Sequence, residues 1–307
     1  MSAILITGAA TGIGNTTARR LAADGHTVHA GMRDPARDDA EHARELLDHA
    51  RREGGDVRVV ELDVTAQGSA DAAVASILGD TGELDVVIHN AGHLYVGYVE
   101  AFTAEDITHL FDVNAVGAHR VNRAALPHLR ERGRGTLLYV SSTIGVTTPP
   151  FLGPYVASKV AFDALAVTTA YETNPFGVET SIVMPGAITK GTRHFSNATR
   201  AGDTRVAEAY AALDPLVARN EEATASLVVP GVDPGPVGVA EEISRILALP
   251  FGEKPFRSVV DFTDSGVDEV NEVARRVRER FVTRMGFGEL LRPSRTRPTT
   301  SRKEARP

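Results

Sequence analysis

The feature that most constrains this chain is a glycine-rich segment between a short apolar run and a helix-like stretch. Residues 4–6 are Ile, Leu and Ile, which is typical of a strand buried on both faces. Residues 7–14 read TGAATGIG, and a helix-like stretch follows at 15–23. Glycines at such a junction let the backbone approach a pyrophosphate, which the helix N-terminus then faces. A plain glycine-rich turn is the alternative, but the order of strand, glycines and helix favours a dinucleotide site.

Strand-like and helix-like patterns alternate along most of the chain. Further strands are expected at 27–30, 57–62, 84–88, 135–141, 177–183 and 256–262, and helices at 42–52, 69–78, 104–132 and 239–249. This alternation predicts a parallel sheet with right-handed crossovers. We therefore expect an α/β fold of the Rossmann type: a doubly wound, mostly parallel sheet in three layers (α/β/α). With 307 residues, 42% of them hydrophobic, we expect a single domain over residues 1–292.

Several small and polar residues follow the expected strands. Asp63 and Val64 follow one strand, and Asn90, Ala91 and Gly92 follow another. Ligands of parallel sheets lie beyond the carboxyl ends of the strands, so we expect these residues to line the cofactor. Turns use the same residue types, which leaves ordinary turn chemistry as an alternative.

The end of the second expected strand bears on the form of the cofactor. An NAD site usually places a carboxylate there for the ribose 2′-hydroxyl. This chain has Gly31 at that point and Arg33 two residues later, and a guanidinium suits a 2′-phosphate. Thr11 could add a hydroxyl to that phosphate. Arg33 could instead pair with Asp34 or Asp38. We expect NADP(H), with NAD(H) as the alternative.

Residues 142–159 carry the candidate chemistry. Tyr155 and Lys159 are four residues apart, so on a helix they share one face. An ammonium about 4 Å from a phenolate stabilises it by roughly 4 kcal/mol at an effective dielectric near 20. This would lower the pKa of the phenol enough for general acid–base catalysis. Ser142 precedes the intervening loop, which could bring its hydroxyl to the phenol. Alone, the pair could equally be a solvated lysine near a packed tyrosine.

Composition excludes several other classes of function. The formal net charge is −7, which leaves no overall basic field for nucleic acid, and the absence of cysteine excludes disulfides and thiolate catalysis. None of the histidines forms a metal-binding pattern, so no metal is expected. No apolar run approaches membrane-spanning length and the first strand leaves no room for a signal peptide, so we expect a cytoplasmic protein without a membrane partner.

Together these motifs resemble the short-chain dehydrogenase/reductase family in its single-domain branch. The motifs are Thr7-Gly8-x-x-x-Gly12-Ile13-Gly14, Asn90-Ala91-Gly92, Asn114, Ser142, Tyr155-x-x-x-Lys159 and Pro185-Gly186. Their order and spacing cover residues 3–190 well and 237–265 loosely, and several weak motifs in register make a strong signal. Residues near Ser142, Pro150 and Tyr155 are also similar to 17β-hydroxysteroid dehydrogenase-like members.

The resemblance implies roles for individual residues. Tyr155 would be the acid/base, Lys159 would depress the pKa of Tyr155 and bind the nicotinamide ribose, and Ser142 would orient the substrate oxygen. Asn114 would hold a water that links Lys159 to solvent, whereas a mid-helix Asn without a family context usually points to solvent. The cofactor contacts expected from the motifs are Gly8, Thr11, Gly12, Ile13, Gly14, Arg33, Asp63, Val64, Asn90, Ala91, Gly92, Tyr155, Lys159, Pro185, Gly186, Ile188 and Thr189.

Two residues depart from the family pattern. His89 stands where the family usually has another Asn, which affects the hydrogen bonding of that loop. Lys190 stands where a Thr commonly follows the Pro-Gly turn, so Thr189 or Thr192 would have to contact the carboxamide.

The interval between the sixth expected strand and the helix expected at 239–249 predicts a substrate lid at about 187–238. A helix is expected at 205–219, and the side chains that could form an apolar pocket wall are Phe151, His194, Phe195, Tyr210 and Leu213. A further helix at about 266–286 carries an apolar stripe that begins at Val267, with arginines around it. Residues 293–307 are basic and rich in Pro, Ser and Thr, which predicts a disordered tail.

These features favour NADPH-dependent reduction of a ketone or aldehyde to an alcohol, with an apolar small molecule as the partner. An NAD-dependent alcohol or hydroxysteroid dehydrogenase is the runner-up. A non-catalytic nucleotide sensor on the same fold is a third possibility, against which the intact Ser142, Tyr155 and Lys159 argue. The resemblance implies that the helices of Asn114 and Tyr155 pair between subunits, so we expect a homodimer or homotetramer.

Overall fold

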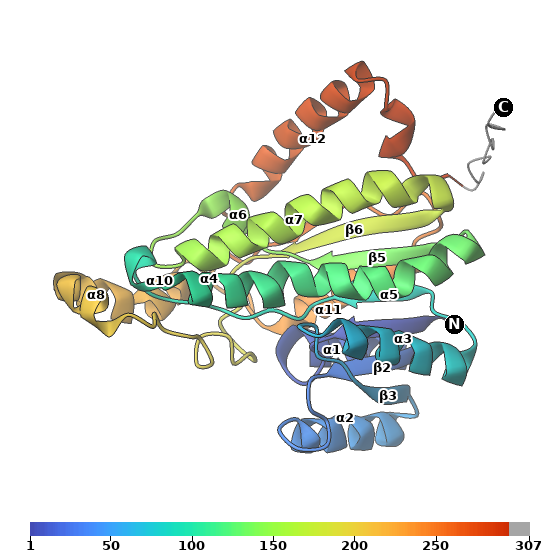
Figure 1. Cartoon of the computed structure of the whole chain (residues 1–307), viewed down its shortest axis with the longest axis horizontal. Coiled ribbons are helices and arrows are strands. Elements are labelled where there is room, and N and C mark those ends of the chain that lie inside the picture. The colour runs from blue at the N-terminus through green and yellow to red at the C-terminus, as the bar shows by residue number, and fades with distance from the viewer. Residues whose placement is uncertain (295–307) are drawn as a thin grey trace, which may run out of the picture.

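The protein is built on a seven-stranded parallel sheet (Figure 1). A computed structural model describes residues 1–294. The strand order is β3-β2-β1-β4-β5-β6-β7. The strands are β1 (Ala3–Thr7), β2 (Thr27–Met32), β3 (Asp56–Glu61), β4 (Val86–His89), β5 (Gly135–Val140), β6 (Val178–Pro185) and β7 (Arg257–Val260). The order reverses between β1 and β4, and such a switch point is where doubly wound sheets bind their ligands.

Helices cover both faces of the sheet and form two separate cores. On one face α1 (Gly12–Ala23), α2 (Ala40–Glu53) and α11 (Pro236–Ala248) bury Leu21, Leu46 and Ile243. On the other face lie α3 (Gln67–Thr81), α5 (Gly117–Arg132) and α7 (Gly153–Thr173), which bury Ile77, Leu129 and Phe162. The three layers, the parallel sheet and the two-sided winding confirm the predicted fold class.

The long helix predicted at 104–132 is interrupted. It comprises α4 (Ala104–Phe111), a π-helical segment at Asp112–Val116, and α5. Asn114 lies within the π segment and is buried, so the solvent-facing alternative for this residue is wrong. Single π turns inside α-helices are frequent at functional sites.

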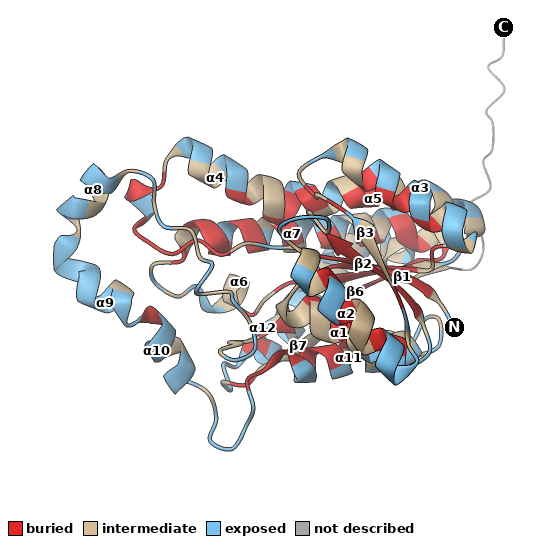
Figure 2. Cartoon of the chain, turned by 90° about the horizontal axis from the view of Figure 1, so that it is seen from below, coloured by how far each residue is buried: buried red, intermediate tan, exposed pale blue. Residues whose placement is uncertain are grey.

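The segment between β6 and α11 contains four short helices and no strand. They are α8 (Thr204–Ala209), a 3₁₀ turn at Ala211–Leu213, α9 (Asp214–Ala218) and α10 (Asn220–Ser226). The single helix predicted at 205–219 is therefore wrong. Pro215 lies in the first turn of α9, where it has no amide to donate to the carbonyl four residues earlier and so cannot continue the preceding turn as one helix. Figure 2 shows these helices extending away from the sheet with mostly exposed residues.

The described part of the chain ends beside the carboxyl end of α7. After α12 (Val267–Arg284) and a 3₁₀ turn at Gly288–Leu291, the Asn174 side chain donates to the Leu290 carbonyl and the Ser294 amide donates to the Asn174 carbonyl. The predicted disordered tail lies outside the described residues, except for Pro293 and Ser294. Among residues 1–294, no helix is both long enough and apolar enough to span a membrane.

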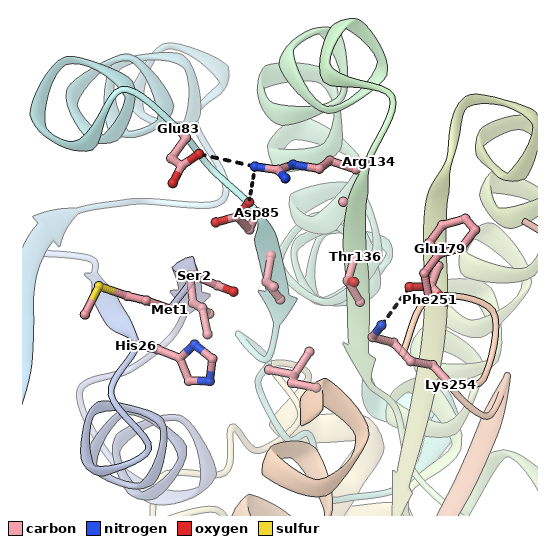
Figure 3. A pocket seen from close by; sticks show the side chains of 14 residues that line it. Met1, Ser2, His26, Glu83, Asp85, Arg134, Thr136, Glu179, Phe251 and Lys254 are labelled. Carbon is pink, nitrogen blue, oxygen red and sulfur yellow. Dashed lines mark hydrogen bonds and ion pairs between the residues drawn. The ribbon is translucent and has the colours of Figure 1, made fainter. Parts of the chain in front are cut away.

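A cavity of about 260 Å³ lies at the amino ends of the strands (Figure 3). Its charged groups are paired: Lys254 Nζ lies 2.7 Å from the Glu179 carboxylate, and Arg134 lies 3.5 Å from Glu83. Because the pairs leave little unsatisfied charge, and because this is the edge opposite to the switch-point crevice, we regard this cavity as a structural feature of the domain rather than its ligand site.

Candidate active site

The loop after β1 and the loop after β4 are joined at the switch point. The Thr7 hydroxyl accepts from the backbone amides of Asn90 and Ala91 at 3.0 and 2.9 Å. The Asn90 side chain donates to the carbonyls of Thr7 and Gly8, both at 3.0 Å. Thr7 was quoted in the sequence motif but was not recognised as the residue that holds the two loops together. Asn90 is thus committed to the loop, and its backbone faces the crevice with that of Ala91.

The glycines of the first loop form a cradle that side chains would fill. Gly8 and Gly12 have φ of +67° and +56°, which favours glycine. A Cβ on Gly14 would lie 2.4 Å from the Gly8 carbonyl oxygen. The loop therefore presents bare backbone ahead of the N-terminus of α1, with Thr11 at the N-cap. This cradle fits the pyrophosphate of a dinucleotide. Ile13, by contrast, packs its side chain against the core of that face.

Tyr155 and Lys159 lie one turn apart near the start of α7. Pro154 occupies the first turn of the helix, where its missing amide is harmless. Both side chains are buried, with exposed fractions of 6% for Tyr155 and 7% for Lys159, so the solvated-lysine alternative is wrong. Lys159 Nζ donates to the Val140 carbonyl at 3.1 Å and lies 6.0 Å from the centroid of the Tyr155 ring.

Gly92 and Asn114 lie beside the lysine. A Cβ on Gly92 would be 3.5 Å from Asn114 Oδ1 and 3.7 Å from Lys159 Nζ. Asn114 Oδ1 accepts from the backbone amide of His93 at 2.7 Å. Asn114 Nδ2 donates to the backbone carbonyl of His93 and to the Ser158 hydroxyl, both at 2.9 Å. The side chain of Asn114 therefore fixes the loop after β4 against α7. His93 and Ser158 were not recognised from the sequence.

Burial dominates the ionisation of the pair. It raises the pKa of the Tyr155 phenol above its usual value and lowers the pKa of Lys159 to about 8. The spacing of Tyr155 and Lys159 predicted the opposite shift, in which the lysine lowers the pKa of the tyrosine. The structure differs because the Lys159 ammonium is directed to a backbone carbonyl and is itself desolvated. At neutral pH the phenol therefore keeps its proton.

Ser142 follows β5 and is held by backbone groups. Its hydroxyl donates to the Pro185 carbonyl at 3.4 Å and accepts from the Ile144 amide at 3.2 Å. Between residues 1 and 294, no hydrogen bond joins Ser142 to Tyr155. The structure thus places Ser142 at the carboxyl edge of the sheet, next to the strand end that carries Pro185 and Gly186.

The phenol of Tyr155 meets a residue from the predicted lid instead. His194 Nε2 and Tyr155 Oη are 3.2 Å apart, and the two rings are in an edge-to-face arrangement with centroids 5.5 Å apart. Burial and the charge of Lys159 lower the pKa of His194 to about 4, so the imidazole is neutral at neutral pH. His194 was predicted to form part of a pocket wall, but no feature of the sequence indicated its contact with the Tyr155 phenol.

The other predicted wall residues are dispersed. Phe195 packs against the apolar cluster that contains Tyr155, Leu152 and Leu94. Phe151 and Tyr210 both contact the Tyr98 ring, with centroid distances of 6.0 and 4.9 Å. Leu213 is exposed. The cluster around Tyr155 is therefore apolar, and His194 is its polar member closest to the phenol.

The predicted cofactor contacts that follow β2 and β3 lie at the carboxyl ends of those strands. Arg33 follows β2 and forms no ion pair within the described chain, whereas Asp34 pairs with Arg37 at 2.8 Å. Asp63 accepts from the amide and hydroxyl of Thr65 in a local turn. Val64 packs close to Gly117, where a Cβ would lie 2.9 Å away. Asp63 and Val64 therefore have structural roles in their turn.

The strand end after β6 is held from the opposite side. The Gly186 amide donates to the Val260 carbonyl at 2.8 Å, and a Cβ on Gly186 would lie 2.4 Å from Asp261 Oδ1. Ile188 packs against the core, and the Thr189 amide donates to the Pro234 carbonyl at 3.2 Å. Thr192 lies beside the glycine cradle, because a Cβ on Gly12 would be 3.4 Å from its methyl group.

Comparison with known proteins places this arrangement in a family. The family model described as short chain dehydrogenase matches residues 2–201. The chain belongs to the short-chain dehydrogenase family. The predicted family is therefore confirmed.

Two curated relatives illustrate the similarity of this short-chain dehydrogenase. It is 34% identical to the 3-ketodihydrosphingosine reductase of Bacteroides thetaiotaomicron over 61% of this chain and 64% of that protein. It is 35% identical to the 17-beta-hydroxysteroid dehydrogenase type 1 of Mus musculus over 60% of this chain and 54% of that protein. The chain thus spans less than two thirds of the length of each relative.

Two solved structures extend the similarity over more of the chain. A short-chain dehydrogenase from Streptomyces avermitilis has a TM-score of 0.69 and 26% identity, and covers 94% of this chain and 98% of that chain. An alcohol dehydrogenase from Thermococcus sibiricus, complexed with 5-hydroxy-NADP, has a TM-score of 0.66 and 26% identity, and covers 85% of this chain and 96% of that chain.

His89 is a departure of this short-chain dehydrogenase from the family pattern, and the structure accounts for it. Its ring stacks on Tyr139 with centroids 4.6 Å apart, and Nε2 lies 2.8 Å from Asn122 Oδ1. Asn122 in turn donates to the Tyr139 hydroxyl at 2.8 Å. His89 therefore faces the α5 side of the core, and the loop is held by Thr7 and Asn90 without it.

Replacing His89 with Asn is expected to reduce the acid sensitivity of the fold. Burial lowers the pKa of His89 from 6.5 to about 4, so the stability that its neutral form contributes is complete above pH 6.5 and is lost as the pH falls toward 4. Between those pH values the wild type should lose up to ~3 kcal/mol more unfolding free energy than the variant. Urea titrations at several pH values measure this difference.

The exposed His119 provides the matched control, since His119→Asn should leave the wild-type pH dependence in place. Equal losses of unfolding free energy in wild type and His89→Asn would contradict the assignment.

Proposed function

We propose that this chain reduces a ketone or aldehyde to an alcohol with NADPH, and that Tyr155 supplies the proton. One observation carries the proposal: a buried phenol that keeps its proton at neutral pH lies in an apolar cluster at the switch point, one helical turn from a buried lysine. A proton donor must be protonated in the resting enzyme, so the raised pKa favours reduction over alcohol oxidation.

The residues present account for the proton and for the placement of the substrate. When bound, a reduced nicotinamide dinucleotide would supply the hydride that the carbonyl carbon receives. Tyr155 Oη would donate its proton to the carbonyl oxygen as that oxygen gains negative charge. The Lys159 ammonium would stabilise the phenolate that remains, and would reach the ribose through the space beside Gly92.

The remaining assignments rest on the family motifs and on position. Ser142 would turn its hydroxyl from the Pro185 carbonyl to the substrate oxygen. Asn114 would help to hold the water that returns a proton to Lys159. The glycine cradle would hold the pyrophosphate, Asp63 and Val64 the adenine, and Ile188 with Thr189 or Thr192 the carboxamide.

The substrate that fits best is apolar and of moderate size. The cluster around Tyr155 includes Leu94, Tyr95 and Phe102 from the body and Phe195 and Val217 from the segment between β6 and α11, which we propose is the lid. The names of the two curated relatives, a ketone reductase and a hydroxysteroid dehydrogenase, support a carbonyl or hydroxyl group on an apolar frame. This part of the proposal concerns chemical class and not a particular compound.

The deciding experiment follows NADPH absorbance over panels of ketones, quinones, steroids and acyl carbonyls. Turnover on at least one apolar carbonyl compound, absent in Tyr155→Phe, supports the proposal. Nucleotide binding with no turnover on any panel would instead support the sensor. Faster oxidation of alcohols with NAD than reduction with NADPH would support the dehydrogenase alternative.

Replacing Arg33 with Asp is expected to reverse the cofactor preference. Arg33 has no ion-pair partner in the described chain and follows β2, where a guanidinium can bind the 2′-phosphate and a carboxylate can bind the 2′-hydroxyl. The ratio of kcat/KM for NADPH to that for NADH should fall by about 100-fold, equivalent to ~2.7 kcal/mol. Steady-state kinetics with both cofactors measures it.

Arg37→Asp is the matched control, since Arg37 already pairs with Asp34. An unchanged ratio in Arg33→Asp would show that Arg33 does not read the phosphate.

We further propose, on the family resemblance, that the chain works in the cytoplasm as a homodimer or homotetramer in which α5 and α7 pair between subunits. Val116 before α5 and Val160 and Leu165 on α7 are large apolar residues exposed on these elements, which supports such a contact.

A further inference from the structure

Helix α12 carries an exposed apolar stripe that the fold leaves uncovered. Figure 1 shows this helix extending away from the body beyond α7. The stripe consists of Val270, Val273, Val277, Phe281 and Met285, with exposed side-chain fractions between 49% and 63%. Spacings of three and four residues place the five on one side of the helix. Exposed single apolar residues are ordinary, but a contiguous row marks an interaction surface.

One flank of the stripe is anchored to the body, because Val267, Asn271 and Arg278 lie beside the stripe at 100° per residue, so the helix cannot simply turn the stripe inward. Val267 is buried in the core, and the Asn271 side chain contacts Met184 Sδ at 3.3 Å. Further along, the guanidinium of Arg278 lies 4.1 Å from the centroid of the Phe256 ring. These contacts fix the rotation of the helix about its axis and leave the stripe on the outside.

The charges beside the stripe are segregated along the helix. The amino-terminal half carries Asp268, Glu269 and Glu272, and the carboxyl-terminal half is dominated by arginines. Glu272 forms an ion pair with Arg275. Glu269, Arg276, Arg280 and Arg284 form no ion pair within the described chain, and at 100° per residue they border one side of the stripe.

We propose that a second copy of this chain covers the stripe, with two α12 helices packed antiparallel across a two-fold axis near Val277. In that arrangement Glu269 of each copy lies near Arg284 of the other, because the two residues are almost equally distant from Val277. The acidic half of each helix then faces the basic half of its partner, and the two helix dipoles oppose. The surface is thus complementary to itself, as an isologous contact requires.

Other occupants fit the surface less well. Residues 295–307 contain no Val, Ile, Leu, Met or Phe, so this segment of the chain has no side chains to fill an apolar row. An anionic membrane would attract the arginines, but it would repel Asp268, Glu269 and Glu272 on the same helix. A second copy satisfies both halves at once.

The first test is the effect of charge within the stripe on assembly. Val277→Glu with Phe281→Glu should halve the assembly mass measured by light scattering across a concentration series. The result would be monomers from dimers, or dimers from tetramers if α5 and α7 also pair. Val237→Glu is the matched control, since Val237 is equally exposed on α11. Unchanged circular dichroism and melting temperature would show that the variant is folded, and an unchanged mass would overturn the proposal.

The second test establishes the register through charge reversal. Glu269→Arg or Arg284→Glu alone should weaken association roughly fivefold or more, because each contact occurs twice in the pair, and the double variant should restore it. Failure of the double variant to recover would contradict the antiparallel arrangement.

The third test measures distances directly, since the chain has no cysteine of its own. Spin labels at Val277→Cys should lie close together, whereas labels at Asp268→Cys should be about 27 Å further apart along the axis, at nine residues of 1.5 Å on each copy. Equal distances at the two positions, or a monomer that sediments with vesicles of phosphatidylcholine and phosphatidylserine, would overturn the proposal.

Discussion

Replacing Tyr155 with Phe is expected to lower kcat for carbonyl reduction by about 10²–10⁴-fold, the range that a positioned general acid contributes. The substitution removes one hydroxyl and leaves the ring in the apolar cluster with Leu152 and Leu94. The Tyr155 hydroxyl is hydrogen-bonded to His194, so the fold should tolerate the loss of this hydroxyl. Affinity for NADPH, measured by fluorescence titration, should change little.

Tyr210→Phe is the matched control for that measurement. Tyr210 lies in the segment proposed as the lid, where its hydroxyl donates to Glu100 and its ring stacks on Tyr98. Removing this hydroxyl touches no part of the proposed proton path and should alter kcat by no more than a few fold. Turnover of Tyr155→Phe at the wild-type rate on any substrate would remove Tyr155 from the reaction.

Replacing Gly14 with Ala is expected to abolish tight dinucleotide binding and to destabilise the fold. The new Cβ would lie 2.4 Å from the Gly8 carbonyl oxygen and 2.5 Å from Asn90 Nδ2, so the two loops at the switch point would have to separate. Overpacking of this kind costs about 1–3 kcal/mol of unfolding free energy. The dissociation constant for NADPH should rise at least ~10-fold, equivalent to ~1.4 kcal/mol. Urea titration and calorimetry measure the two effects.

Gly79→Ala is the matched control, because it adds the same methyl group at a position where the opposite effect on stability is expected. Gly79 lies within α3, and a Cβ there would meet nothing within 4 Å. Alanine should therefore stabilise the protein by up to ~1 kcal/mol and leave NADPH binding unchanged. If Gly14→Ala binds NADPH as tightly as Gly79→Ala, the loop does not form the pyrophosphate cradle.

The parts of the fold that the sequence predicted well are those where local pattern and burial coincide. Strand β1 was expected and found at Ala3–Thr7, because a parallel strand buried on both faces is a continuous apolar run. The loops after β1 and β4 were equally recognisable, since their glycines and Asn90 are dictated by backbone geometry. Tyr155 and Lys159 were placed on one buried helical face as expected.

The features that escaped prediction depend on contacts distant in the chain. The contact of His194 with Tyr155 joins residues 39 positions apart, in a segment without regular periodicity. The direction of the Tyr155 pKa shift depends on how completely the site excludes water, which spacing alone does not reveal. The stripe on α12 was visible as a pattern from Val267 onward, but a pattern does not say whether the body or another molecule covers it.

The hydrogen bond between His194 and Tyr155 has a consequence for how ligands are admitted. In the proposed reaction, a carbonyl oxygen that receives the proton must take the position that the imidazole holds, so substrate and histidine would compete for the Tyr155 hydroxyl. Substrate binding would therefore require the residues around His194 to move away from Tyr155. The free energy of that displacement lowers the affinity for substrate. A small polar carbonyl compound would offset little of that free energy. A bulky apolar molecule would offset it through contact with Phe195 and Val217. Discrimination by size can thus arise at entry, before any chemistry takes place.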